Sequence, residues 1–357
     1  MSIVVYLLVL AVVYSIWVLT LKHGLKSLSC TREFSRQAVF EGEEAELIEV
    51  VRNDKPFFIP WLRVESRISP YIRLGRQDNL HVTGEMYYCS LFTLMPYQQI
   101  RRKHRVRFLH RGAYDLGNAS LTAGDLLGIK NYQRTQSLRV PVLVYPRLLD
   151  ETEVPLPMSR MLGELSNRRQ LLQDPFLVRG IRPYLPGDPV RDIHWPATAR
   201  TGDVQVRIHD YTTRTKLLVV LNTQLEDVQW QNHLPENQEP IIEYGISLAA
   251  TLCVQALQNG LASGFAANMP LGDIPDSTLL LPADGAVREE ELLAAFARLT
   301  IRRTEPFPAL LESLSTYTGL DILLLSTYDS ESIQAEIQQL RRCGNQVTLH
   351  LFKGGAL

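Results

Sequence analysis

The sequence predicts an α+β protein of several domains: an N-terminal transmembrane helix, a β-sandwich domain and a doubly wound α/β domain. Three observations lead to this prediction. Residues 3–21 are apolar and carry no charge, residues 25–150 alternate apolar and polar positions between turn formers, and residues 179–357 alternate strand-like with helix-like patterns. A chain of 357 residues is long enough for two soluble domains in addition to an anchor.

The N-terminal stretch, residues 3–21, reads IVVYLLVLAVVYSIWVLTL. A helix of this length crosses a hydrocarbon core of about 30 Å. The first two residues supply no positive charge and no small-residue cleavage site follows, so we expect an uncleaved anchor rather than a signal peptide or an apolar core helix. Lys22, Lys26 and Arg32 follow the stretch. The positive-inside rule therefore predicts a single-pass protein of the cell membrane, with residues 1–24 as anchor and basic flank and the C-terminal domains in the cytoplasm.

Residues 25–150 show the period-two pattern of strands in segments such as LRVESRI, YYCSLFTL and RVPVLVYP. Short strands at regular spacing with little helical periodicity predict a β-sandwich-like domain. The run RRKHRVR at residues 101–107 leaves two interpretations open. It is either a solvated strand face that exposes Lys103, Arg105 and Arg107, or a surface for anionic lipid or an acidic partner.

The remaining chain is divided into a linker and an α/β domain. Residues 151–178 include VPLPMSRMLGELSNRRQLLQDP, whose prolines at both ends predict a linker with one short helix. Within residues 179–357, KLLVVLN and DILLLST have the continuous apolar character of buried parallel strands, and residues 241–260 have the pattern of a long helix. In such sheets ligands bind at the carboxyl ends of strands, which directs attention to residues 222–226 and 326–329.

Composition and short motifs exclude several function classes. The formal net charge of −1 provides no global field for nucleic acid, so we predict no nucleic-acid partner. The four cysteines lie far apart and are typical of reduced thiols, although their even number leaves bridges open. Neither GxxxxGK[ST] nor GxGxxG occurs, so any nucleotide chemistry belongs to a partner.

Residues 179–211 are the richest in chemically active side chains and read RGIRPYLPGDPVRDIHWPATARTGDVQVRIHDY. The candidate network consists of Arg182, Tyr184, Asp188, Arg191, His194, Trp195 and Arg200. Arginines can fork onto carboxylates and Trp195 offers a flat packing surface, so the network either braces the start of the α/β domain or docks a partner or anionic ligand. His194 beside Asp192 has the pattern of a general base, but no nucleophile motif such as G-x-S-x-G accompanies it. We therefore predict no catalytic residues and no enzyme activity.

The spacing of this network, together with Gly187 and Gly202, resembles the signature of the bacterial domain of unknown function 58 family. RGAYDLG at residues 111–117, VYPR at residues 144–147 and the apolar N-terminus resemble the same family. The resemblance covers nearly the whole chain. It implies an anchor and a β-rich region joined to a von Willebrand factor type A-like domain. It also implies a partner, an AAA+ ATPase of the MoxR type.

The residues after the first α/β strand bear on a metal site. Type A domains that bind a divalent cation place Asp-x-Ser-x-Ser there, because Mg²⁺ favours carboxylate and hydroxyl oxygens. This chain has Asn222, Thr223 and Gln224 followed by Leu-Glu, so an amide replaces the carboxylate and both serines are missing. Asp329 adds one carboxylate. We predict a degenerate site at Asn222, Gln224 and Asp329, with Asn222 as a strand-end cap, no functional metal and no cofactor.

The function predicted from these features is that of a membrane-anchored cytoplasmic adaptor that works with a MoxR-type ATPase in protein assembly or envelope-related processes. The alternative is a metal-dependent ligand-binding protein or hydrolase. It would use Asp188, His194 and the strand-end residues.

Overall fold

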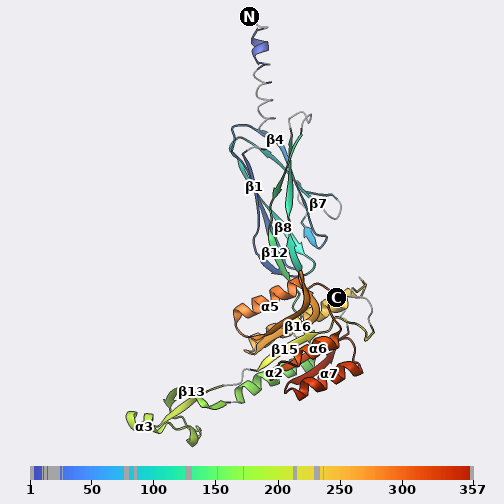
Figure 1. Cartoon of the computed structure of the whole chain (residues 1–357). Helices are drawn as coiled ribbons and strands as arrows, with labels where there is room; N and C mark the ends of the chain where they lie inside the picture. The colour runs from blue at the N-terminus through green and yellow to red at the C-terminus, as the bar shows by residue number, and fades with distance from the viewer. Residues whose placement is uncertain are drawn as a thin grey trace. The chain divides into compact units, whose positions relative to one another are not determined.

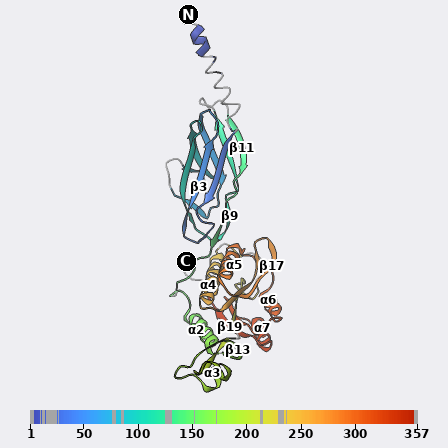
Figure 2. The ribbon, with the colours of Figure 1, turned by 90° about the vertical axis from the view of Figure 1, so that its left-hand side faces the viewer.

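The structure is a computed structural model of the chain. It describes residues 4–9, 11, 14, 25, 27–75, 80–83, 87–124, 131–150, 152–171, 173–211, 215–228, 234–235 and 237–353. The chain divides into two compact units, unit 1 (Met1–Arg147) and unit 2 (Leu148–Leu357). Beyond the helical residues near the N-terminus, the described part of unit 1 contains strands, whereas unit 2 contains both helices and strands (Figures 1 and 2).

The predicted transmembrane helix, residues 3–21, lies only partly within the described residues. Residues 4–9, 11 and 14 are helical, and the rest of the stretch lies outside the described part of the chain. Among the described residues, one helix is long and apolar enough to cross a membrane: α4 (Glu239–Gln258) of unit 2. Because 67% of its most apolar window is buried within the protein, α4 has the character of a core helix. The N-terminal membrane span therefore stays a prediction.

The described strands of unit 1 form three sheets. The first has the order β1 (Leu28–Phe34), β3 (Glu44–Asn53), β8 (Gln99–Phe108), β5 (Ile72–Leu74). The second has the order β11 (Asn131–Ser137), β10 (Asn118–Gly124), β4 (Ile59–Arg67), β7 (Tyr87–Leu94), β6 (Leu80–Thr83). The third has the order β2 (Ala38–Phe40), β12 (Pro141–Tyr145), β9 (Gly112–Asp115).

The first two sheets of unit 1 share a hydrophobic core. Cys30 and Val51 of the first sheet pack in one cluster with Leu62, Phe92 and Leu121 of the second. Buried and less buried positions alternate along most of these strands, although β3 and β7 each also bury three consecutive residues. Two sheets that bury facing sides in this way fit the β-sandwich-like domain predicted for residues 25–150.

The basic run of unit 1 lies on β8. Lys103, Arg105 and Arg107 are exposed, as the alternation predicted, whereas His104 between them is buried. Lys103 donates through Nζ to Glu46 on β3, with a nitrogen-to-oxygen distance of 2.7 Å. The run is therefore an exposed strand face that carries a cross-strand ion pair. This exposure is compatible with both interpretations given to the run.

A buried polar cluster lies on the inner face of the same sheet. Arg32 Nε donates to Glu49 Oε1 at 2.8 Å, Tyr88 Oη donates to Glu49 Oε2 at 3.0 Å, and Arg32 also donates to the Ser66 hydroxyl. The side chains of Arg32 and Glu49 are fully buried. Burial alone raises the pKa of the Glu49 carboxyl, but the imidazole of His104, with Nε2 3.8 Å from Glu49 Oε2, and the charge and hydrogen bond of Arg32 lower this pKa to about 2. Glu49 is therefore an ionised carboxylate in the interior of the sandwich.

Unit 2 contains a sheet with helices on both faces. Its elements are α2 (Leu156–Leu171), β13 (Gln173–Pro183), η1 (Val190–Asp192), α3 (Trp195–Thr201), β14 (Gln205–Tyr211), β15 (Lys216–Leu221), α4, β16 (Ala262–Leu271), β17 (Ile274–Ala283), α5 (Ala286–Arg298), α6 (Phe307–Leu314), β18 (Asp321–Ser326), α7 (Glu331–Arg342) and β19 (Gln346–Leu351). The sheet order is β17-β16-β15-β18-β19, and all its pairs are parallel except β16 with β17. The predicted buried strands at 216–222 and 321–327 correspond to β15 and β18.

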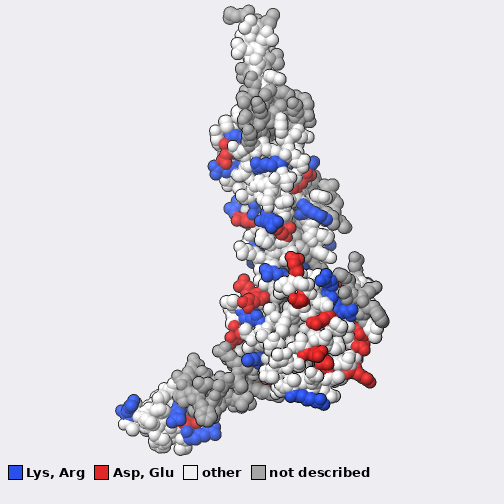
Figure 3. Space-filling view, viewed as in Figure 1, with Lys and Arg blue, Asp and Glu red and all other residues white. Residues whose placement is uncertain are grey.

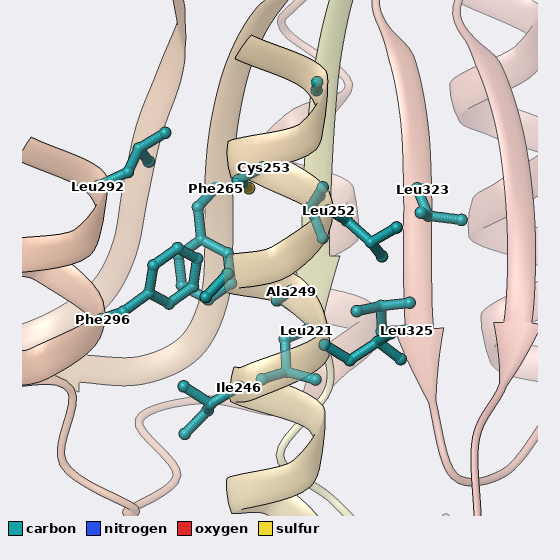
Figure 4. Close-up of a cluster of buried hydrophobic side chains, with 14 of the residues drawn as sticks. Leu221, Ile246, Ala249, Leu252, Cys253, Phe265, Leu292, Phe296, Leu323 and Leu325 are labelled. Atoms are coloured by element: carbon teal, nitrogen blue, oxygen red, sulfur yellow. The ribbon is translucent and has the colours of Figure 1, made fainter. Parts of the chain in front are cut away.

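The central strand β15 separates two cores. Leu217, Val219 and Leu221 pack with α4 and α5 in one cluster, and Leu218 and Val220 pack with α6 and α7 in another. Figure 4 shows Leu221 in one cluster with Ile246 and Ala249 of α4, and Phe265 beside Phe296. The last two rings have centroids 4.5 Å apart. Helices of both faces thus bury the sheet.

The segment 151–178, predicted as a linker with one short helix, contributes to the first of these cores. Its helix α2 is 16 residues long, and Met158, Leu162 and Leu165 pack in the cluster with β15 and α4. These three residues recur at a spacing of three to four, so they lie on one face of the helix. The segment is therefore part of the α/β fold rather than a connector outside it.

We predict that the stability of unit 1 depends on the Glu49 carboxylate and falls in acid. A carboxyl whose pKa is about 2 in the folded state, against an ordinary glutamate pKa of 4.5, stabilises the fold above pH 4.5 and loses this effect as the pH falls towards 2. Glu49→Gln should lower the free energy of unfolding of unit 1 at neutral pH by about 3 kcal/mol and flatten its acid dependence. Thermal unfolding of the full chain, followed by circular dichroism between pH 7 and pH 3, measures both effects.

The matched control is Glu46→Gln, which removes a carboxylate from the exposed face of the same strand. It should leave the neutral-pH unfolding temperature almost unchanged, because exposed ion pairs contribute little. Equal effects of the two substitutions would contradict a special role for Glu49.

Candidate functional site

The seven predicted network residues lie in one local structure, which we call the signature hairpin (residues 180–208). Strands β13 and β14 pair antiparallel, with Arg182 opposite Val206 and Pro183 opposite Gln205. The turn η1 and the helix α3 connect the strands. The helix α3 carries a proline in its first turn and ends at Gly202, whose φ of 82° is left-handed. Proline at a helix start and left-handed glycine at its end are local signals that fix the bounds of α3.

An arginine–aspartate clamp closes the first turn of the hairpin. Arg182 donates through both terminal nitrogens to the two carboxylate oxygens of Asp188, each at 2.7 Å. The backbone N–H of Leu185 donates to the same carboxylate at 2.8 Å. The hydrogen bonds from Arg182 and from Leu185 lower the pKa of Asp188. Asp188 therefore remains ionised and joins a strand end to the turn that follows it, as a brace does.

His194 acts as the N-cap of α3 rather than as an evident base. Its Nδ1 accepts the backbone N–H of Ala197 at 3.0 Å, and its own backbone N–H donates to Gln205 at 2.7 Å. Thr198 completes the connection, because its hydroxyl accepts the N–H of Gln205 at 3.0 Å. With Nδ1 occupied as an acceptor, His194 ties α3 to β14.

The other network residues face solvent. The Arg191 side chain is 82% exposed, 3.7 Å from the Asp192 carboxylate, and Trp195 is 63% exposed. Tyr184 and Arg200 are exposed as well. The structure thus divides the seven residues into a bracing group (Arg182, Asp188, His194) and an exposed group (Tyr184, Arg191, Trp195, Arg200).

Apolar exposure extends beyond the predicted network. Large apolar side chains that are at least one third exposed are Ile181, Leu185, Val190, Val204 and Ile208. Within the described side chains of the signature hairpin, Val206 is the one apolar residue that is buried. Sequence reasoning did not select these residues, because an apolar residue type does not by itself show whether the side chain is buried or exposed. Exposed apolar groups interspersed with arginine and tryptophan are typical of a protein-binding surface.

The second predicted site lies at the carboxyl ends of β15 and β18, where the sheet order reverses. Asn222 donates through Nδ2 to Ser326 Oγ at 3.1 Å and accepts the N–H of Gln224 on Oδ1 at 2.9 Å. Gln224 Oε1 accepts the backbone N–H of Phe307 at 2.6 Å. Asn222, Gln224 and Ser326 are all buried. The geometry joins both strand ends and the start of α6 through amides.

Asn268 on β16 belongs to the same network although it was not predicted. Its Oδ1 accepts the backbone N–H of Thr223 at 2.8 Å, and its Nδ2 donates to the carbonyl of Glu305 at 3.2 Å. An amide near the carboxyl end of the neighbouring parallel strand was the available sequence signal.

Asp329, the third predicted member of the degenerate metal site, is hydrogen-bonded to α7 rather than to Asn222 or Gln224. Both of its carboxylate oxygens accept from Gln334 Nε2 on α7, at 3.0 and 2.8 Å. Within the described part of the chain, no group of three or more histidine, cysteine, aspartate or glutamate residues is arranged to hold a metal ion. The donor set at the strand ends is mostly amide and hydroxyl, which suits hydrogen bonding within the protein better than Mg²⁺ coordination.

Comparison with protein families gives one match. The model described as "Protein of unknown function DUF58" matches residues 180–270, which include the signature hairpin, β15, α4 and most of β16. This match supports the resemblance to that family over a quarter of the chain. None of the curated proteins compared with the chain matches it.

Three of the solved structures similar to this chain have low TM-scores. A non-cellulosomal cohesin from Archaeoglobus fulgidus is 8% identical, with 32% of this chain and 91% of that chain covered and a TM-score of 0.22. The CARDB domain of a Pyrococcus furiosus protein is 20% identical, with 33% and 97% covered and a TM-score of 0.20. A protein of unknown function from Porphyromonas gingivalis W83 is 12% identical, with 36% and 51% covered and a TM-score of 0.24. Likenesses at these scores carry no argument.

We predict that the clamp holds the first turn of the signature hairpin in place. Asp188→Ala removes the acceptor of the Leu185 N–H and frees Arg182, so the turn should open more often. Hydrogen exchange of a peptide covering residues 183–190 should accelerate several-fold, with little change elsewhere in unit 2. Arg191→Ala provides the control, because Arg191 is exposed in the same hairpin and should leave this exchange unchanged. Accelerated hydrogen exchange of this peptide in both variants, or in neither, would refute the bracing role.

We also predict that Asn222 supports the fold of unit 2. Asn222→Ala leaves the buried Ser326 hydroxyl and the Gln224 N–H without the partners described above, which should cost about 1–3 kcal/mol in free energy of unfolding. Urea unfolding of the full chain measures this loss. Glu226→Gln, an exposed change in the same loop, should have almost no effect. An Asn222→Ala variant as stable as the unchanged chain would contradict the prediction.

Proposed function

We propose that this protein is a membrane-anchored cytoplasmic adaptor whose signature hairpin binds a protein partner. The partner suggested by the family resemblance is an AAA+ ATPase of the MoxR type, with a role in protein assembly or envelope-related processes. The observation that carries the proposal is the exposure of Trp195, Arg191 and five further apolar side chains on a hairpin held by the Arg182–Asp188 clamp.

We further infer that the sheet of unit 2 is a von Willebrand factor type A-like domain. Counting from β15 as the first strand, the order β17-β16-β15-β18-β19 is 3-2-1-4-5, the order of doubly wound sheets. The covering of both faces by helices supports the same inference.

The surface chemistry of the hairpin favours a protein rather than a nucleic acid. Trp and Arg are the residue types that most often dominate protein interfaces, particularly beside apolar neighbours. On the face of unit 2 that Figure 3 shows, Lys and Arg are interspersed with Asp and Glu rather than joined in one continuous basic patch. A mixed surface of this kind lacks the electrostatic footprint of nucleic-acid binding.

The alternative, a metal-dependent ligand-binding protein or hydrolase, has less support. It requires Asp188 and His194 for chemistry, but Asp188 is engaged by Arg182 and His194 caps α3. It also requires metal-binding oxygens at Asn222 and Asp329, whose side chains bond to Ser326 and Gln334. Retention of Mg²⁺ by the purified chain, lost in Asn222→Ala and in Asp329→Asn, would favour this alternative over the adaptor.

A crosslinking pull-down from native membranes tests the adaptor function. Trp195→Ala and Arg191→Ala should each reduce recovery of an AAA+ ATPase roughly tenfold or more, because truncating an interface hot spot costs about 2 kcal/mol. Val287→Ala and Arg342→Ala are matched controls, since they change an exposed apolar and an exposed basic residue on α5 and α7. All variants must unfold at the temperature of the unchanged chain.

Recovery of the ATPase with the controls but not with the hairpin variants would establish the hairpin as its binding surface. If correctly folded hairpin variants retain every partner, binding occurs elsewhere and the proposal fails in its present form. If no AAA+ ATPase is recovered with the unchanged chain, the partner assignment fails.

A further inference from the structure

Several chain connections of unit 1 meet at one end of the β-sandwich, which we call the entry end. The antiparallel pairing places Leu28 opposite Asn53, and Arg52 opposite Gln99. In the other sheet Ile59 lies opposite Leu94. The start of β1, the turn from β3 to β4 and the turn from β7 to β8 therefore lie together.

The chain is fixed to the entry end from Leu25 onwards. Leu25 packs partly buried against the sandwich core, and its carbonyl accepts from Arg134 Nη1 at 3.2 Å. The carbonyl of Ser27 accepts the backbone N–H of Asp54 at 3.0 Å. Leu25 and Ser27 are thus both bonded to the sandwich.

The sequence leaves very little chain between this point and the predicted membrane span. The apolar stretch ends at Leu21, so three residues, Lys22 to Gly24, separate it from Leu25. Four virtual bonds of extended chain reach at most about 14 Å. When the stretch 3–21 spans a bilayer, the entry end therefore lies within the headgroup region or directly beside it.

The turn from β7 to β8 presents amphipathic side chains at this end. Tyr97 is 69% exposed and Met95 is 56% exposed. Several bonds hold the turn, because the Asn53 amide donates to the carbonyl of Met95 at 2.9 Å and the N–H of Tyr97 donates to the carbonyl of Lys55 at 3.2 Å. Tyr97 has a φ of 56°, a conformation uncommon for a bulky residue. The chain thus maintains an exposed ring at the tip of a well-braced turn.

We propose that the entry end rests on the membrane, with Tyr97 and Met95 inserted at the boundary between headgroups and acyl chains. This inference rests on the membrane anchorage in the proposed function and adds a second contact to it. Tyrosine suits this boundary because its ring is apolar and its hydroxyl is polar. Lys22 and Lys26, which follow the predicted span in the sequence, favour a bilayer that contains anionic lipid. The contact orients the sandwich on the bilayer, because it adds a second point of attachment to the anchor.

The opposite end of the sandwich provides a matched control. Tyr71 is also an exposed tyrosine, at 48%, and its carbonyl accepts the N–H of Leu109 at 2.8 Å, just beyond the end of β8. The ten residues of β8 separate the two ends by about 30 Å. Tyr71 and Tyr97 therefore compare the same residue type at the two ends of one domain.

The test measures the depth of single fluorescent labels in the full chain. Tyr97→Cys, Met95→Cys, Tyr71→Cys and Ser15→Cys are each made in a Cys343→Ser background, because Cys30, Cys89 and Cys253 are buried. Each variant carries a nitrobenzoxadiazole label and is reconstituted into phosphatidylcholine–phosphatidylglycerol vesicles. Nitroxide-labelled lipids with the spin label near the headgroup or deep in the acyl chain then quench the fluorophore according to its depth.

The inference expects strong quenching by the shallow nitroxide at positions 97 and 95, and several-fold weaker quenching at position 71. Ser15, inside the predicted span, reports the anchor and should be quenched by the deep nitroxide. Quenching at position 15 without quenching at 97 and 95 overturns this inference and leaves the anchor intact. Absence of quenching at position 15 overturns the anchor and this inference with it. Equal quenching at 71 and 97 also overturns the inference, because the contact would then not be specific to the entry end.

A label that disturbs folding is recognised by a lowered unfolding temperature. Positions 95 and 97 lie in the same turn, so either one that retains the unfolding temperature of the unchanged chain decides the result. A folded variant at either position without shallow quenching is sufficient to reject the inference.

Discussion

The α/β part of this protein depends on the burial of β15 on both faces. Its residues from Leu217 to Leu221 are all inaccessible to solvent, and their alternation assigns odd positions to one core and even positions to the other. Every helix that packs on the sheet does so against one of these two cores. Because β15 pairs in parallel with β18, the carboxyl ends of the two strands lie side by side, and Asn222 bonds to Ser326 there.

Much of this architecture was predictable because the spacing of apolar residues in the sequence indicates which positions are buried. Continuous apolar runs marked β15 and β18, and period-two alternation marked strands such as β8. The helix α2 was harder to recognise as part of the core. Its polar residues and flanking prolines are typical of a linker. Its three core residues, Met158, Leu162 and Leu165, lie on one face only if the segment is taken to be a helix.

The residues of the candidate sites could be predicted from the sequence, but the role of each residue could not. The sequence places Arg182 six residues before Asp188, and only the turn between them shows that the two form a fork-to-fork pair. Arg191 and Trp195 belong to the same motif as this pair, but their side chains are exposed to solvent. Asn268 was missed because its contact with Thr223 depends on the pairing of two strands that are distant in sequence. Non-local pairing of this kind has no signature in local spacing.

The buried pair of Arg32 and Glu49 has a consequence for strand alignment. Arg32 lies directly opposite Glu49 in the pairing of β1 with β3. A slip of one residue would turn Arg32 to the solvent face and leave Glu49 alone in the interior, and a slip of two residues would leave both charges buried without each other. The pair therefore acts as a register lock. Because β1 is the first strand of the sandwich, this lock also determines which residue of the chain emerges at the end where the N-terminal segment joins.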